Sequence, residues 1–193
     1  MKKQTIGLSS LLSLILALAL PGVSIALVES DRWTESWRAV DPEDETLVLD
    51  TIEGSIRVRG VESNEIRLVI EKRLEAPTRA EMEEIESMMP LRIDRRPGVI
   101  EVLVDAPWRD EGNGWHGDRH WSNPGSLRYD FTAEIPREMA VVLKTVNDGE
   151  IRTEDVRGSF EVRNVNGGLR LQGLGAAGSA KTVNGDVEIR KKP

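Results

Sequence analysis

The chain has no cysteine, two histidines and few aromatic residues: five Trp, two Phe and one Tyr among 193 residues. The lack of cysteine excludes disulfides, thiol nucleophiles and zinc-thiolate centres. Asp and Glu outnumber Lys and Arg by 33 to 26, which gives a formal charge of −7. An acidic protein does not attract nucleic acid or anionic lipid through its overall charge. We therefore expect no nucleic-acid partner.

The first 26 residues predict an export signal. Lys2 and Lys3 give a positive start, residues 8–20 form an apolar run, and Pro21 and Gly22 interrupt it. The small residues Ser24 and Ala26 then stand where a signal peptidase reads, so we predict cleavage after Ala26. The protein is accordingly expected to be exported, to the periplasm or the cell envelope.

The alternative is an uncleaved membrane anchor, because residues 5–28 carry no charge and are long enough to span a bilayer. The Pro-Gly break and the small residues favour cleavage. Cleavage would leave residues 27–193 as a single domain with no stable membrane span.

A short repeat occupies the C-terminal third. Val-Asn pairs occur at 146–147, 165–166 and 183–184, each followed by Gly or Asp-Gly, and a more distant copy runs from Asp50 to Val58. Apolar residues alternate with charged ones on either side of each turn, as in half-buried strands. A constant period with Asn in the same phase predicts stacked coils, although hairpins joined by Asn-Gly turns are the competing interpretation.

The rest of the chain also has a strand pattern, with one exception. Thr78 and Glu81 have the spacing of a helix capping box, which predicts a short helix from about 78 to 88. Its methionines are expected in the core, with a methionine metal site as the alternative. Trp33 and Trp37 are expected to cover one end of the strands, with sugar binding as the alternative. The predicted fold class is all-β: a β-solenoid or β-helix of stacked strands, with this helix and an N-terminal signal helix.

The order of these features resembles a known family. An export signal, a Gly-containing first coil at residues 52–56, a capped helix, a strand ending at Ile135-Pro136 and repeated Val-Asn-Gly turns together resemble the adhesin-like β-solenoid family of unknown function in bacterial envelopes. The resemblance spans nearly all of residues 27–193 and rests on order and phase. It implies a β-helical, non-enzymatic envelope protein without assigned catalytic residues or cofactor.

One segment has ligand-like spacing. His116, Asp118 and His120 include both histidines, and two imidazoles with a carboxylate could bind Zn²⁺ or another divalent metal. The competing interpretation is a solvated loop, because the surrounding residues 110–125 are rich in glycine and supply no obvious fourth ligand. We favour the loop, and we expect no cofactor.

The same segment contains Trp108, Trp115 and Trp121. Flat indole rings on a loop can stack on sugars or anchor a protein interface. They can equally fold back over the strands, and the sequence does not separate the two possibilities.

Two rows of side chains are predicted to be structural. Asn147, Asn166 and Asn184 are expected to form a ladder that fixes strand register. Glu150, Glu161 and Glu188 alternate with arginines, which indicates a charge-paired strand surface and not a polysaccharide-cleaving site.

The sequence therefore predicts an exported, non-enzymatic binding or scaffolding module of the cell envelope. Its partner would be an unknown envelope protein or glycan, with the 108–121 loop as the preferred contact surface. The alternatives are a metal- or carbohydrate-binding protein that uses this loop, and an envelope-stress regulatory element.

Overall fold

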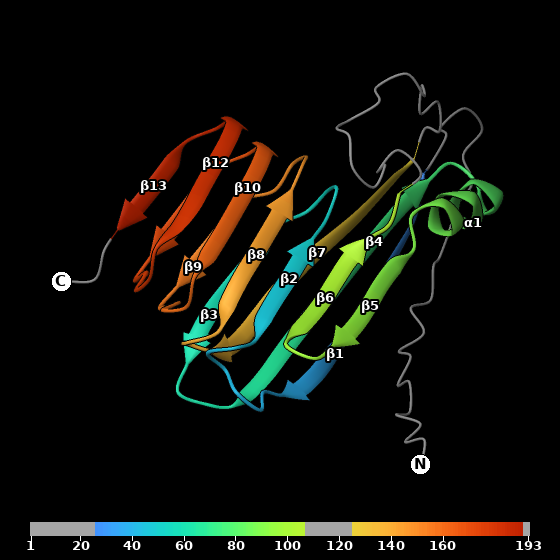
Figure 1. The fold of residues 1–193 in the computed structure, drawn as a ribbon. Helices are drawn as coiled ribbons and strands as arrows, with labels where there is room; N and C mark the ends of the chain where they lie inside the picture. Colours follow the sequence, from blue (N-terminus) through green and yellow to red (C-terminus); the bar gives the residue numbers. More distant parts are fainter. Residues whose placement is uncertain (1–25, 107–124, 191–193) are drawn as a thin grey trace, which may run out of the picture.

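The computed structural model describes residues 26–106 and 125–190, which form thirteen strands and one helix (Figure 1). The elements, in chain order, are β1 (Leu27–Arg38), β2 (Thr46–Asp50), β3 (Ile56–Val61), β4 (Glu65–Ala76), α1 (Arg79–Met88), β5 (Leu91–Arg96), β6 (Val99–Val104), β7 (Ser126–Pro136), β8 (Ala140–Thr145), β9 (Ile151–Glu154), β10 (Phe160–Asn166), β11 (Leu169–Gln172), β12 (Gly178–Asn184) and β13 (Val187–Arg190).

The strands form two mixed sheets with the core between them. Sheet A has the order β1-β4-β7-β3-β9-β11-β13, and sheet B has the order β12-β10-β8-β2-β6-β5. In the view of Figure 1, sheet B lies in front of sheet A. Alternate residues of both sheets point inward, among them Leu47, Ile56 and Phe131, none of which is exposed.

The predicted β-solenoid is wrong, although the chain is mostly β. β4 pairs antiparallel with both β1 and β7, and β5 pairs antiparallel with β6. Strands of 11 or 12 residues, such as β4 and β7, also do not share the short period of the Val-Asn copies. The error came from extending a period seen in the C-terminal third to the whole chain, where long alternating strands pair antiparallel instead.

We call β1, β4, β5, β6, β7 and α1 the antiparallel half. Every second residue of β4 from Ile66 to Ala76 is buried. α1 packs on β4 through Met82 and Ile85, both buried, so these core positions agree with the prediction. The helix begins after Thr78, whose hydroxyl accepts the N–H of Glu81 at 3.3 Å; the Glu81 carboxylate accepts the hydroxyl proton at 2.7 Å instead of capping the Thr78 amide.

Trp33 and Trp37 lie on β1, the edge strand of sheet A. They stand opposite Ile70 and Ile66 of β4 and pack, partly buried, against the core. This position fits the predicted covering role.

One charge lies inside the antiparallel half. Lys72 is on the inward face of β4 and only 6% exposed, and its Nζ pairs with Glu86 of α1 and lies 3.8 Å from Asp31 of β1. Its aliphatic stem lies among the core residues while the ammonium stays near half-exposed carboxylates. The same two carboxylates add to the effect of burial, which raises the pKa of Tyr129 to about 12.

We call β2, β3 and β8 to β13 the parallel half, because these strands pair with one another in parallel. Its turns stack closely at four glycines. A Cβ on Gly149 would lie 1.7 Å from the Gly54 carbonyl oxygen, one on Gly167 would lie 2.0 Å from that of Gly149, and one on Gly185 would lie 2.3 Å from that of Gly167. Only a residue without a Cβ allows this approach.

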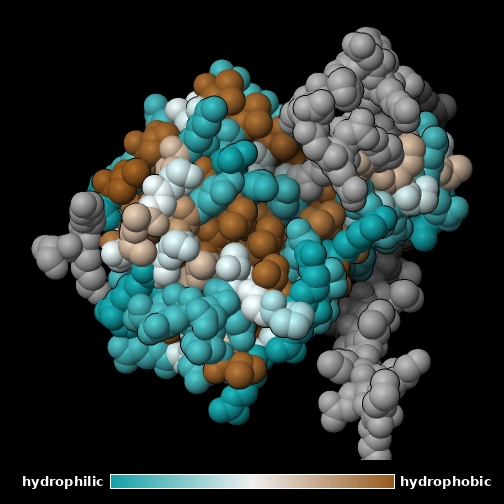
Figure 2. Space-filling view, in the orientation of Figure 1, coloured by the Kyte–Doolittle hydropathy of each residue, from teal (hydrophilic) through white to brown (hydrophobic). Residues whose placement is uncertain are grey.

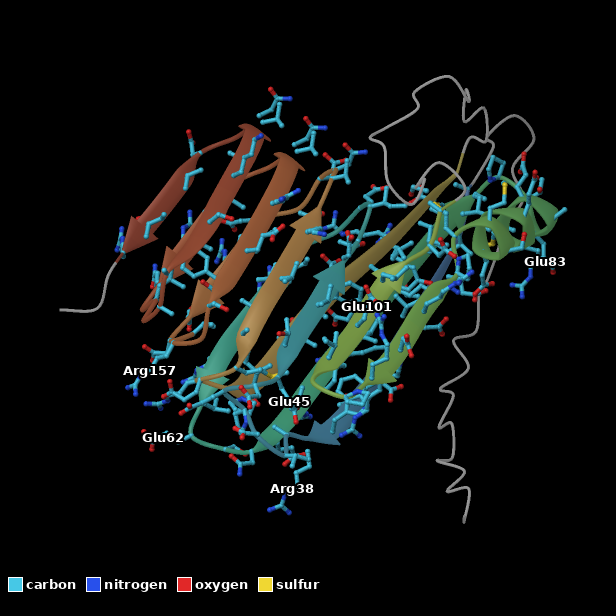
Figure 3. All side chains as sticks on the ribbon, viewed as in Figure 1. Arg38, Glu45, Glu62, Glu83, Glu101 and Arg157 are labelled. Atoms are coloured by element: carbon cyan, nitrogen blue, oxygen red, sulfur yellow. The ribbon has the colours of Figure 1, made fainter. Side chains whose placement is uncertain are left out.

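Two rows of hydrogen bonds accompany the glycines. The predicted asparagine ladder is confirmed at the turn ends of β8, β10 and β12: Asn184 donates to Asn166, and Asn166 donates to Asn147, both at 2.8 Å. Figure 3 draws the side chains of the described residues on the two sheets. An inner row was not predicted, in which Thr145 and Asn164 each donate at 2.9 Å to a glycine carbonyl of the neighbouring turn. Both rows fix the register of the parallel strands.

Candidate functional site

The predicted site residues cannot be placed. Trp108, Trp115 and Trp121, and the metal set His116, Asp118 and His120, lie outside the described residues. Within residues 26–106 and 125–190, no three or more His, Asp or Glu side chains group so as to hold a metal ion. The loop residues stay predictions, and the candidate surfaces of the described residues lie on the two sheets.

The strongest candidate is the last strand of each sheet, β12 and β13, which we call the terminal edge. β12 ends sheet B and β13 ends sheet A, so among the described strands each has a neighbour on one side only. The main-chain groups on the other side face outward, and an open strand edge of this kind can pair with another strand. In Figure 1 the two strands form one end of the molecule.

Apolar side chains are also exposed at the terminal edge. Val187 and Ile189 are 45% and 51% exposed, whereas Leu169 and Leu171, their partners in register on β11, are buried. Val183 of β12 is 65% exposed. Figure 2 shows apolar surface along the same end of the molecule. Open main-chain edges and exposed apolar side chains thus coincide.

The sequence analysis did not predict this exposed surface. Val187 and Ile189 alternate with charged residues, and Leu169 and Leu171 alternate with polar ones in the same way. The sequence pattern therefore predicts Val187 and Ile189 to be core residues. They are exposed because a strand at the end of a sheet has nothing beyond it. Position in the sheet order, which the sequence alone did not give, decides their exposure.

A second candidate is a charged hollow of about 330 Å³ on sheet A, lined by residues of β1, β4 and β7. Arg128 makes its main contacts there, donating to both carboxylate oxygens of Asp130 at 2.8 and 2.9 Å and to the Asp148 carbonyl at 2.9 Å. The guanidinium is therefore already bonded within the protein, as expected of a structural ion pair.

The pKa values of two acidic residues near Arg128 are shifted in opposite directions. Burial would raise the pKa of Asp130, but the hydrogen bonds from Arg128 and from the Ser55 amide outweigh it and hold that pKa below its usual value. Burial, helped by the nearby Asp148 carboxylate, raises the pKa of Glu53. These shifts follow from packing within the protein, and they do not identify a ligand.

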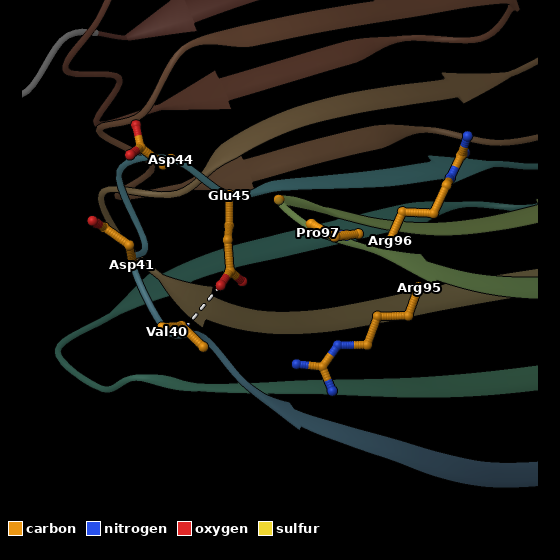
Figure 4. A pocket seen from close by; sticks show the side chains of 8 residues that line it. Val40, Asp41, Asp44, Glu45, Arg95, Arg96 and Pro97 are labelled. Atoms are coloured by element: carbon orange, nitrogen blue, oxygen red, sulfur yellow. Dashed lines mark hydrogen bonds between the residues drawn. The ribbon is translucent and has the colours of Figure 1, made fainter.

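A third hollow, of about 460 Å³, lies between the β1–β2 connection and the β5–β6 turn (Figure 4). Asp41, Asp44 and Glu45 line one side, and Arg95 lines the other. Glu45 accepts the Val40 amide at 2.8 Å, and Arg95 donates to the Arg38 carbonyl at 3.3 Å. Glu45 and Arg95 thus bond to the nearby main chain, and the hollow is open to solvent.

The charge-paired surface predicted for Glu150, Glu161 and Glu188 is confirmed. Arg152 and Arg170 pair with Glu150, Arg163 pairs with Glu161, and Arg170 and Arg190 pair with Glu188. Hydrogen bonds from Arg170 and Arg190 lower the pKa of Glu188. These carboxylates are thus held by arginines on the strand surface.

No helix within the described ranges, 26–106 and 125–190, has the length and apolarity needed to cross a membrane. No family model matches the chain, and no curated protein matches it either.

Two solved structures align with part of the fold. One, from Clostridium sporogenes and described as a "putative cell adhesion protein", is 10% identical, with coverage of 84% of this chain and all of that one, and a TM-score of 0.38. The other, from Parabacteroides distasonis and described as a "putative lipid binding protein", is 12% identical, with coverage of 82% of this chain and 60% of that one, and a TM-score of 0.30. At these TM-scores neither likeness supports an argument about function, and the resemblance to the adhesin-like family stays a prediction.

Proposed function

We propose that the protein is an exported, non-enzymatic binding or scaffolding module of the bacterial cell envelope, and that it holds its partner by strand addition at the terminal edge. The observation that carries this proposal is the exposure of Val183, Val187 and Ile189 on two strands whose outer edges are open. Main-chain pairing would supply affinity, and the apolar side chains would supply selectivity. Export is supported by the sequence of residues 1–26.

The other described surfaces support binding less well. In the two charged hollows, the side chains of Glu45, Arg95, Arg128 and Asp130 already bond to groups of the protein itself. A ligand there would have to break these bonds, whereas a strand added at the terminal edge would form new ones and cover apolar surface.

Site-specific crosslinking tests the proposal. A photo-crosslinking amino acid is placed at position 183 in one variant and at position 40 in another, and both are irradiated in intact envelopes. Val40 is a matched control because it is 87% exposed and apolar but lies in the β1–β2 connection, away from β12 and β13. We expect adducts from position 183 and few from position 40.

A second substitution makes the test specific. Ile189→Lys would place a charge on the inward face of β13, and it should remove the adducts of position 183 while circular dichroism stays unchanged. Equal adducts from both positions, or adducts that persist in the Ile189→Lys background, would contradict strand addition at this edge.

A further inference from the structure

The terminal edge sets two conditions on whatever covers it. β12 and β13 belong to different sheets, so a complete partner must supply one strand to each sheet. Its strands must also bring apolar residues to the inward face, where Val187 and Ile189 are half-exposed. One extended peptide can meet the first condition for only one of the two sheets.

A second copy of the chain meets both conditions. Rotation about a two-fold axis perpendicular to the sheets brings the β12 and β13 of the second copy alongside those of the first, at the same spacing between sheets. Each sheet then continues through an antiparallel pair of identical strands. The inward faces of the two copies then adjoin, and Ile189 of one copy can lie beside Ile189 of the other.

Charge selects the register of this pairing. Residues directly opposite in an antiparallel pair share a face, so only every second register keeps Val187 and Ile189 inward. In one such register, Ile189 lies opposite its own copy and Glu188 lies opposite Arg190 of the second copy. A shift of one step in either direction sets Glu188 against Glu188 or Arg190 against Arg190, and like charges opposite each other destabilise a sheet.

We infer that the terminal edge is a self-association surface, at which two copies of this chain join both sheets with Glu188 of each copy opposite Arg190 of the other. The inference rests on the proposed function, since it names the partner of the same edge.

Lys181 shares the outward face of sheet B with Lys144 and Arg163, its neighbours in register, so its ammonium stays in water in the pair. With two strands of seven and four residues in contact, the dimer should be weak, with a Kd on the order of micromolar.

Charge exchange between two variants tests the inference. Sedimentation velocity over a concentration series should show a reversible dimer for the wild type. Glu188→Arg alone sets two arginines opposite each other in both pairs, and Arg190→Glu alone sets two glutamates opposite each other, so each should raise the Kd about tenfold. An equimolar mixture of the two variants restores opposite charges by joining unlike copies: one of its two pairs then holds two introduced side chains of opposite sign, and the other holds the two native ones. The mixture should recover heterodimers near the wild-type affinity.

The mixture separates pairing from folding. Glu188 also pairs in its own chain with Arg170 at 3.1 Å and with Arg190 at 2.6 Å, so either substitution alone affects more than the dimer, but only contact between copies predicts recovery on mixing. Val40→Lys is the control that should leave the Kd unchanged. A wild type that stays monomeric at high concentration, or a mixture no better than either variant alone, would overturn the inference.

The outcome is distinguishable from that of the proposed function. A monomeric wild type whose position-183 crosslinks to another envelope component are lost in Ile189→Lys would keep the proposed function and exclude a second copy as the partner. A monomeric wild type without such crosslinks would exclude both.

Discussion

The antiparallel and parallel halves share an alternating sequence pattern, but they bury different amounts of it. In β4 every inward residue from Ile66 to Ala76 is buried, whereas β12 and β13 contain no buried residue. β4 has β1 on one side and β7 on the other, and α1 packs against it, while β12 and β13 each have one neighbouring strand. The comparison shows that burial here depends on a strand's place in its sheet as much as on its own residues, so stability should concentrate at one end and binding at the other.

The largest effect on stability is expected when an aromatic ring is removed from the core of the antiparallel half. Phe131 of β7 is fully buried, so Phe131→Ala should lower the free energy of unfolding by about 3–5 kcal/mol. Ile189→Ala at the terminal edge should cost less than about 1 kcal/mol, because the side chain is half-exposed. Urea unfolding at low protein concentration measures both, and similar losses for the two variants would refute the comparison.

The next test concerns the close approach of turns in the parallel half. Gly149→Ala should cost about 2–3 kcal/mol, because its Cβ would lie 1.7 Å from a main-chain oxygen and force the turns apart. Gly168→Ala is the matched control: its Cβ would lie 3.6 Å from the Asp186 oxygen, an ordinary contact. If thermal unfolding shows equal losses for the two, the stacked turns tolerate separation and the close approach is not what fixes them.

A smaller effect is expected from the asparagine ladder. Asn166 both donates and accepts in it, so Asn166→Ala removes two exposed hydrogen bonds and should cost about 1 kcal/mol. Asn184→Ala removes one of them and should cost about half as much. Urea unfolding can rank the two variants, and an Asn184→Ala loss as large as that of Asn166→Ala would mean that the ladder does not act pairwise.

The smallest effect is expected at Glu53, where the two halves meet. Its raised pKa means that the folded protein holds this proton more tightly than the unfolded chain does, so the ionised carboxylate weakens folding above that pKa. Glu53→Gln should therefore be slightly more stable than the wild type at about pH 7, and the difference should vanish near pH 3, where the carboxyl is protonated in both states. A wild type more stable than the variant at neutral pH would contradict this sign.

The sequence predicted local features better than it predicted topology. The capped helix and the asparagine ladder depend on residues close together or in phase, and both are present. The antiparallel pairing of β4 with β1 and β7 depends on which distant strands meet, and alternation alone does not encode this. For the same reason the sequence could not show that Val187 and Ile189 lack a covering strand. The predicted loop residues, from Trp108 to Trp121, stay untested because they lie outside the described residues.

The central position of β2 and β3 has a consequence for the timing of folding. β2 lies between β6 and β8, and β3 lies between β7 and β9, so each strand joins partners that come much later in the chain. Such non-local pairs cannot form until their partners are synthesised, and they fold slowly. A chain leaving a ribosome or a translocation channel therefore keeps these two strands, with their inward apolar residues, without their final neighbours until about residue 154 has emerged, the end of β9. During that interval the nascent chain is most exposed to aggregation and most in need of a chaperone.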